Sequence, residues 1–219
     1  MISADDNPML SPVEIATLIA FCTPWAEPSL AYALVIAGSG GEPYRIAQSS
    51  GQVDDHANRP AAERALTSLL AAKQGSTADS ILFVGLMQVP IPASSAHLNE
   101  GRMLLDKCTN LATGIQRYAL AWETALRTDP SPWPRSAVAF NLFRSAQALR
   151  QTDYSTKATE VLKSGQIPRP APPTDPIYHA VAADWSASIA QRHGYRVGAA
   201  DVTLLDDAAA TAQWARSRF

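Results

Sequence analysis

Two short stretches of this chain hold residue types that could do chemistry. The first is the glycine-rich run Gly38-Ser39-Gly40-Gly41, which is followed at once by the carboxylate of Glu42. The second is Gly85-Leu86-Met87-Gln88, in which the amide of Gln88 could bond a polar ligand. The first run lacks the Lys-Ser/Thr pair of a phosphate-binding loop, so nucleotide binding is not indicated. The two stretches therefore offer the carboxyl group of Glu42 as a possible proton donor and the amide of Gln88 as a possible binding group.

The elements around these stretches can be predicted from apolar spacing and from residues typical of helix ends. Ser11-Pro12-Val13-Glu14 is a capping box that predicts a helix ending before Pro24. A second helix is expected from Pro28 to the glycine run, because glycines favour a helix exit. The run from Ser80 to Val84 predicts a strand that leads into the second stretch. The first stretch is therefore expected to end a helix, and the second to end a strand.

Further elements and the domain boundaries follow from the same signals. Helices are predicted over Pro60–Gln74, Asn110–Arg127, Ser136–Leu149 and Thr156–Leu162. Residues 43–58 indicate a loop or short strands, and Pro90 and Pro92 predict a loop. Residues 167–173 are rich in proline and predict a stiff, extended linker. The chain is thus expected to hold one compact domain over residues 10–166, the linker, and a helical extension or tail over residues 174–219.

Composition excludes several classes of function. The formal net charge of -2 gives no field that would attract nucleic acid or an anionic membrane. No apolar run approaches the roughly 20 residues that span a bilayer. The first residues lack the basic and apolar regions of an export signal. Either the numbering begins after a removed signal, or the protein stays inside the cell.

No metal or cofactor is predicted. Cys22 and Cys108 have no histidine at short spacing, so they do not indicate a zinc site. Two buried thiols and a single disulfide both remain open for this pair. The run Asp54-Asp55-His56 is more typical of a solvated turn than of a metal site.

Five segments, in their order along the chain, resemble the lytic transglycosylases that accompany type IV secretion systems. The segments are Cys22, Gly38-Ser39-Gly40, Gly85-Leu86-Met87-Gln88, Cys108-Thr109-Asn110-Leu111 and Phe140-Asn141. After its first Cys, the family has Glu-Ser-Gly, Gly-Leu-Met-Gln-Ile, a Cys-x-Asn-Ile-like helix start and Tyr-Asn. Ser-Gly alone is weakly specific, Gly-Leu-Met-Gln is fairly specific, and the order of all five carries most of the inference. Without the family, the Gly-Leu-Met-Gln run would indicate ordinary packing at a strand end.

The resemblance implies a fold, a compartment and partners. The fold would be lysozyme-like, mainly α within the α+β class, with a small β-sheet edging a cleft that binds the glycan strands of peptidoglycan. The protein would be exported to the periplasm, with peptidoglycan and secretion-system components as partners. The resemblance also favours a disulfide between Cys22 and Cys108. Such a disulfide would close a loop of about 86 residues and stabilise the fold by about 4 kcal/mol in the chain-entropy model.

The resemblance also assigns roles to individual residues. In the family, one Glu protonates the glycosidic oxygen between N-acetylmuramic acid and N-acetylglucosamine and then helps the 6-hydroxyl close a 1,6-anhydro ring. Gly38 stands at that catalytic position, with Ser39 and Gly40 in the adjoining turn. Met87 and Gln88 are expected to line the cleft.

The second wall of the implied cleft also departs from the family pattern. Phe140 and Asn141 match the Tyr-Asn pair, but Phe140 lacks the phenol. Phe143 stands where the family has a small residue. These departures favour natural drift over an artificial replacement at Gly38, although both explanations remain open.

The missing acid predicts lost or impaired cleavage. Glycine cannot transfer a proton, and general acid–base catalysis contributes roughly 10²–10⁴-fold. Glu42 is the nearby carboxylate that could act as a displaced acid, but Pro43 favours an extended backbone that points its side chain elsewhere. The leading hypothesis is a transglycosylase-like protein that is inactive or impaired. The alternative is a catalytically silent module that binds glycan or helps assemble a secretion apparatus.

Overall fold

The computed structural model describes residues 9–72, 80–127, 135–145 and 153–168 of the chain. These residues form a mostly helical α+β structure with a small antiparallel sheet, as the sequence predicts. Most of the predicted linker, from residue 169 on, and the predicted extension over 174–219 lie outside the described residues.

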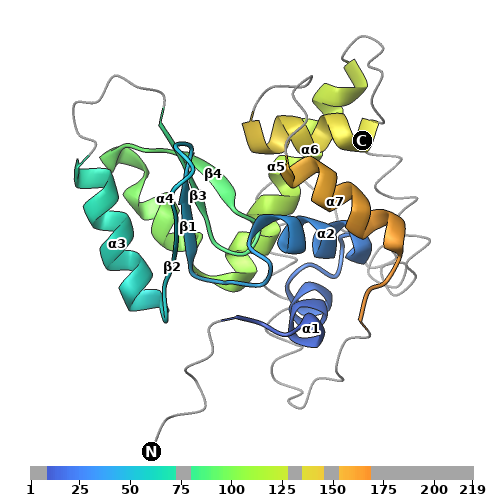
Figure 1. Ribbon diagram of the computed structural model, residues 1–219, viewed down its shortest axis with the longest axis horizontal. Helices are drawn as coiled ribbons and strands as arrows, with labels where there is room; N and C mark the ends of the chain where they lie inside the picture. Colours follow the sequence, from blue (N-terminus) through green and yellow to red (C-terminus); the bar gives the residue numbers. More distant parts are fainter. Residues whose placement is uncertain (1–8, 73–79, 128–134, 146–152, 169–219) are drawn as a thin grey trace, which may run out of the picture.

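The described residues are arranged as a sheet with helices on either side (Figure 1). The strand order is β2-β1-β3-β4, and every pairing is antiparallel. The strands are β1 (Arg45–Gln48), β2 (Val53–Asp55), β3 (Ile81–Val84) and β4 (Val89–Pro92). The helix α3 (Arg59–Ala72) packs with α4 (Leu98–Met103) beside the sheet, and α4 follows the short 3-10 helix η1 (Ser95–His97). The remaining helices gather on the side away from α3.

The first two helices begin and end where the sequence predicts. In α1 (Pro12–Cys22), the Ser11 hydroxyl accepts from the Glu14 backbone N–H at 3.3 Å, and the Glu14 carboxylate accepts from the Ser11 N–H at 2.7 Å. This reciprocal pair is the predicted capping box. The helix α2 (Pro28–Gly38) ends at the glycine run. The position assigned to the family's acid is therefore the last residue of α2.

The predicted loop at Pro90 and Pro92 is wrong, because both prolines lie in β4. This strand is at the edge of the sheet and pairs only with β3. Ala93 continues the ladder by donating its N–H to Ser80 at 2.8 Å, so alternate residues, Val89 and Ile91 among them, point their N–H groups toward β3. The prolines occupy the positions between, where an edge strand needs no N–H donor.

Three further helices complete the described structure: α5 (Lys107–Arg127), α6 (Arg135–Ser145) and α7 (Asp153–Ser164). The helix α5 begins earlier than predicted because Asp106 caps it, accepting from the Thr109 N–H at 2.8 Å. The apolar residues near the start of α5, Leu111 and Ile115 among them, are buried, whereas Leu126 near its end is 46% exposed. None of the described helices is both long and apolar enough to cross a bilayer.

A disulfide between Cys22 and Cys108 joins α1 to α5, with 5.0 Å between the two Cα atoms. This confirms the pairing that the resemblance implies. Cys22 is the last residue of α1, and Cys108 lies in the first turn of α5. The cross-link therefore closes a loop that contains α2, the sheet, α3 and α4.

Candidate functional site

The two stretches singled out in the sequence lie against each other. A Cβ atom added at Gly38 would lie 3.1 Å from the Leu86 carbonyl oxygen and from the Met87 carbonyl carbon, and 3.2 Å from the Met87 carbonyl oxygen. Contacts this short are tighter than nine in ten real Cβ contacts, so a side chain at position 38 would require the facing backbone to shift by a few tenths of an ångström. At the position where the resemblance implies an acid, the backbone of Gly38 lies directly against the backbone of Leu86 and Met87.

Asn110 of α5 holds the turn formed by residues 85–88. Its side-chain oxygen accepts from the Met87 N–H at 2.8 Å, and its amide nitrogen donates to the carbonyls of Val84 at 2.8 Å and Leu104 at 2.9 Å. Gly85 has a φ of 77°, and any side chain there would collide with the Asn110 amide. The sequence does not reveal this role of Asn110, because its three partners lie on other elements.

Met87 and Gln88, expected to line a cleft, are buried in the structure at 0% and 1% exposure. The Gln88 amide nitrogen donates to the carbonyls of Gly85 at 2.9 Å and Arg45 at 3.1 Å. These bonds join the turn to β1. The side chain that was expected to bond a sugar is thus already engaged in holding the site together.

Three of the other expected binding residues are buried as well: Ser39, Phe140 and Asn141. Ser39 is 1% exposed, and its hydroxyl accepts from the Gly41 N–H at 3.1 Å. Asn141 is 1% exposed and Phe140 is 0% exposed. The Phe140 ring packs against Tyr118 of α5, with 5.0 Å between centroids. Gly40, with a φ of 69°, completes the turn after α2.

Arg144 lies over the site from α6, and it is a residue that sequence reasoning missed. Its guanidinium carbon is 3.4 Å from the centroid of the Phe83 ring and 5.7 Å from that of Tyr154. Its Nη1 atom donates to the Gln88 carbonyl at 3.5 Å. Burial lowers the pKa of Arg144 to about 10, which still leaves it charged at neutral pH. These contacts connect α6 to β3 and the turn, and no local sequence pattern could have shown them.

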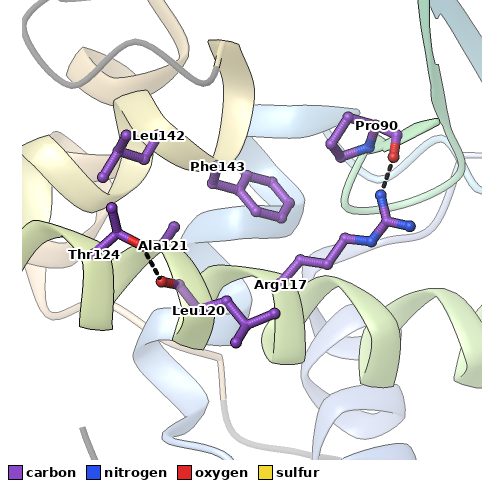
Figure 2. Close-up of a pocket in the computed structure, with 7 residues that line it drawn as sticks. All are labelled: Pro90, Arg117, Leu120, Ala121, Thr124, Leu142 and Phe143. Atoms are coloured by element: carbon purple, nitrogen blue, oxygen red, sulfur yellow. Dashed lines mark hydrogen bonds between the residues drawn. The ribbon is translucent and has the colours of Figure 1, made fainter. Parts of the chain in front are cut away.

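A pocket of about 280 Å³ opens beside this site, between β4, α5 and α6 (Figure 2). Its lining residues are Pro90, Arg117, Leu120, Ala121, Thr124, Leu142 and Phe143. The Arg117 guanidinium donates to the Pro90 carbonyl and to Glu100. Phe143, at the position where the resemblance implies a small residue, contributes a wall of the pocket. Pro90 lies two residues after Gln88, so the pocket adjoins the buried site.

Glu42 remains the nearest candidate carboxylate after α2, and its environment favours the protonated form. Its pKa is raised by partial burial and by the charge of Asp55, and Arg45 opposes this effect. Arg45 is itself paired with Asp55 at 2.6 Å. No group of three His, Cys, Asp or Glu side chains that could hold a metal ion occurs among the residues described.

Replacing Glu42 by Gln is expected to raise the melting temperature at pH 7. A carboxyl whose folded pKa lies above its unfolded value stabilises the fold when protonated, and this contribution is lost as the pH rises through the folded pKa. The gain from Glu42→Gln should therefore disappear below about pH 4, where the native carboxyl is protonated too. Thermal melts at several pH values measure the difference.

Glu14→Gln is the matched control with the opposite sign. Bonds to Ser11 lower the pKa of Glu14, so its contribution is present above the unfolded pKa and is lost as the pH falls through the folded pKa. This variant should lower the melting temperature at pH 7. A shift in the same direction for both variants would contradict the environment described for Glu42.

Comparison with known proteins returned no matching family model, no matching curated protein and no matching solved structure. What the chain does is therefore inferred from its own residues and their geometry.

Proposed function

We propose that this chain is a peptidoglycan-binding protein of the lytic transglycosylase type, with a lysozyme-like fold, that does not cleave the glycan. The observation that carries this proposal is the contact between Gly38 and the Leu86–Met87 backbone. It brings together, from distant parts of the chain, the two motifs with which the family builds its cleft. At this contact the chain has no side chain that could donate a proton.

The loss of cleavage follows from the chemistry of position 38. The family's reaction uses one acid for both proton transfers, so no second carboxylate compensates for its absence. The residues that match the family's binding groups are also engaged internally, as the two bonds of the Gln88 amide illustrate. The motif residues of this chain therefore serve the fold rather than the reaction.

Glycan binding is proposed for the pocket beside the site. Sugar rings present both apolar C–H faces and hydroxyl groups, and this pocket offers both kinds of partner. Leu120 and Phe143 supply apolar surface, whereas Arg117 and Thr124 supply polar groups. The volume of about 280 Å³ is close to the lower end of typical ligand sites, roughly 300 Å³. A short glycan segment fits this description better than a large cofactor does.

The proposed compartment is the periplasm, next to a secretion apparatus. Disulfides persist in oxidising compartments, and the Cys22–Cys108 bond agrees with such a location. A mass measurement of freshly isolated protein, with and without reductant, tests this. Two free thiols would contradict the periplasmic proposal.

Sedimentation with purified peptidoglycan sacculi tests the binding function. We expect the protein to sediment with the sacculi and to release no 1,6-anhydro-muropeptides, as measured by mass spectrometry. Leu120→Gln, at a pocket residue that is 64% exposed, should weaken sedimentation several-fold. Leu126→Gln is the matched control, because Leu126 is 46% exposed on the same helix but does not line the pocket.

The other outcomes separate the alternatives. A folded protein that fails to sediment would contradict glycan binding and favour a role in assembling the secretion apparatus. Release of anhydro-muropeptides by the unaltered chain would show that Gly38 does not abolish cleavage, and would direct attention to Glu42.

A further inference from the structure

Two sets of contacts connect Arg144 with the surroundings of position 38, one through Gln88 and one through Tyr154. Its Nη1 atom bonds the carbonyl of Gln88, and the preceding carbonyl, that of Met87, lies against Gly38. Tyr154, which the guanidinium also faces, donates its hydroxyl to the Leu34 carbonyl at 3.4 Å, one helical turn before Gly38. A glutamate side chain at position 38 would start against the Met87 carbonyl, one peptide unit before the carbonyl that Arg144 bonds.

The described contacts of Arg144 are with the Gln88 carbonyl and with the Phe83 and Tyr154 rings, none of which carries a negative charge. No ion pair joins it to a carboxylate of the described residues. Burial raises the pKa values of Tyr154 and Tyr118, so both phenols are neutral at pH 7.

Of the helices packed against α6, α5 carries Glu123 and α7 carries Asp153 and Glu160, and none of these carboxylates is ion-paired with Arg144. Strand β3 and the turn over 85–88 carry no titratable side chain, and α2 carries only Tyr32, whose pKa is also raised by burial. On β1, Arg45 is already paired with Asp55. Glu42, which precedes β1, interacts with these two side chains. A carboxylate introduced at position 38 would therefore find Arg144 as an available cationic partner.

Building on the proposed function, we propose that Arg144 is a second determinant of the missing cleavage, because its guanidinium would pair with a carboxylate at position 38. Such a pair holds the carboxylate in its ionised form, and an ionised carboxylate cannot protonate the glycosidic oxygen. Restoring the glutamate alone would then leave the site inactive. Two residues, Gly38 of α2 and Arg144 of α6, would then each prevent cleavage. Two such changes are expected of a natural pseudoenzyme, whereas an enzyme with one residue replaced would carry only the first.

Four full-length variants test this proposal. They are Gly38→Glu alone, Gly38→Glu with Arg144→Gln, Gly38→Glu with Arg144→Lys, and Gly38→Gln with Arg144→Gln. NMR titration of the carboxyl introduced at position 38 should give a pKa lower by about 1–3 with Arg or Lys at position 144 than with Gln. Anhydro-muropeptides should be released from sacculi only by the chain that combines Gly38→Glu with Arg144→Gln.

The comparison between variants with Glu and with Gln at position 38 remains valid even if the close contact there lowers their stability. Glu and Gln carry the same Cβ atom, so its cost cancels between them. A double-mutant cycle of melting temperatures, with Gly38→Gln in the Arg144 background as the fourth corner, measures the same pairing without an assigned spectrum. Gly38→Asp offers a shorter carboxylate if the glutamate variants do not fold.

The possible results discriminate sharply. A carboxyl pKa that is the same with Arg144 and with Gln at that position would overturn the proposal. Cleavage by Gly38→Glu alone would overturn it as well. If the pKa responds to Arg144 as expected but no folded variant cleaves glycan, the pairing is supported, and the proposed transglycosylase-type site is what fails.

Discussion

Replacing Asn110 by Ala is expected to lower the free energy of unfolding by about 3–5 kcal/mol. The side chain is fully buried and makes three hydrogen bonds to backbone groups of Met87, Val84 and Leu104. Alanine would leave these three groups in the interior without their partner, and each such group costs about 1–3 kcal/mol. Chemical denaturation monitored by circular dichroism measures the loss.

Two controls separate the role of Asn110 from the general loss of an amide. Asn58→Ala removes an exposed helix cap that accepts from the Ala61 N–H at 3.0 Å, and it should cost only about 1 kcal/mol. Asn110→Asp keeps the size but sets a carboxylate against two carbonyl oxygens, so it should destabilise at least as much as alanine does. If Asn110→Ala lowers the free energy of unfolding no more than Asn58→Ala does, the turn over 85–88 does not depend on the three hydrogen bonds of Asn110.

Breaking the Cys22–Cys108 disulfide is expected to cost about 4 kcal/mol, equivalent to roughly 10 °C in melting temperature for a protein of this size. The cross-link spans a sequence separation of 86 residues and encloses the sheet and α2. Its removal gives the unfolded chain more conformational freedom, and it also releases α1 from α5. Thermal melts of the oxidised and the reduced native protein measure the effect.

The double variant Cys22→Ala with Cys108→Ala distinguishes the cross-link from packing. Cys22 is fully buried, so alanine also removes a packed sulfur atom. We expect the variant to melt slightly below the reduced native protein. Oxidised and fully reduced proteins that melt at the same temperature would contradict a stabilising role for the disulfide.

Features that depend only on residues close together in the chain can be predicted from the sequence. The capping box of Ser11 and Glu14 and the Asn58 cap form between groups three residues apart, so their residue types are sufficient to predict them. The end of α2 at Gly38 is local in the same sense. The absence of a proton donor at that position is likewise a property of the sequence, because no fold can give glycine a side chain.

The roles of the candidate site residues depend instead on contacts between distant parts of the chain. Pro90 lies in a strand because β4 is at an edge, which depends on the order of strands rather than on the residue. The Gln88 amide bonds the carbonyl of Arg45, 43 residues away, so it serves the fold and not an open cleft. Arg144 reaches Gln88 across a separation of 56 residues. Such contacts depend on which backbones pack together, and that is determined by the burial of the whole core rather than by any short motif.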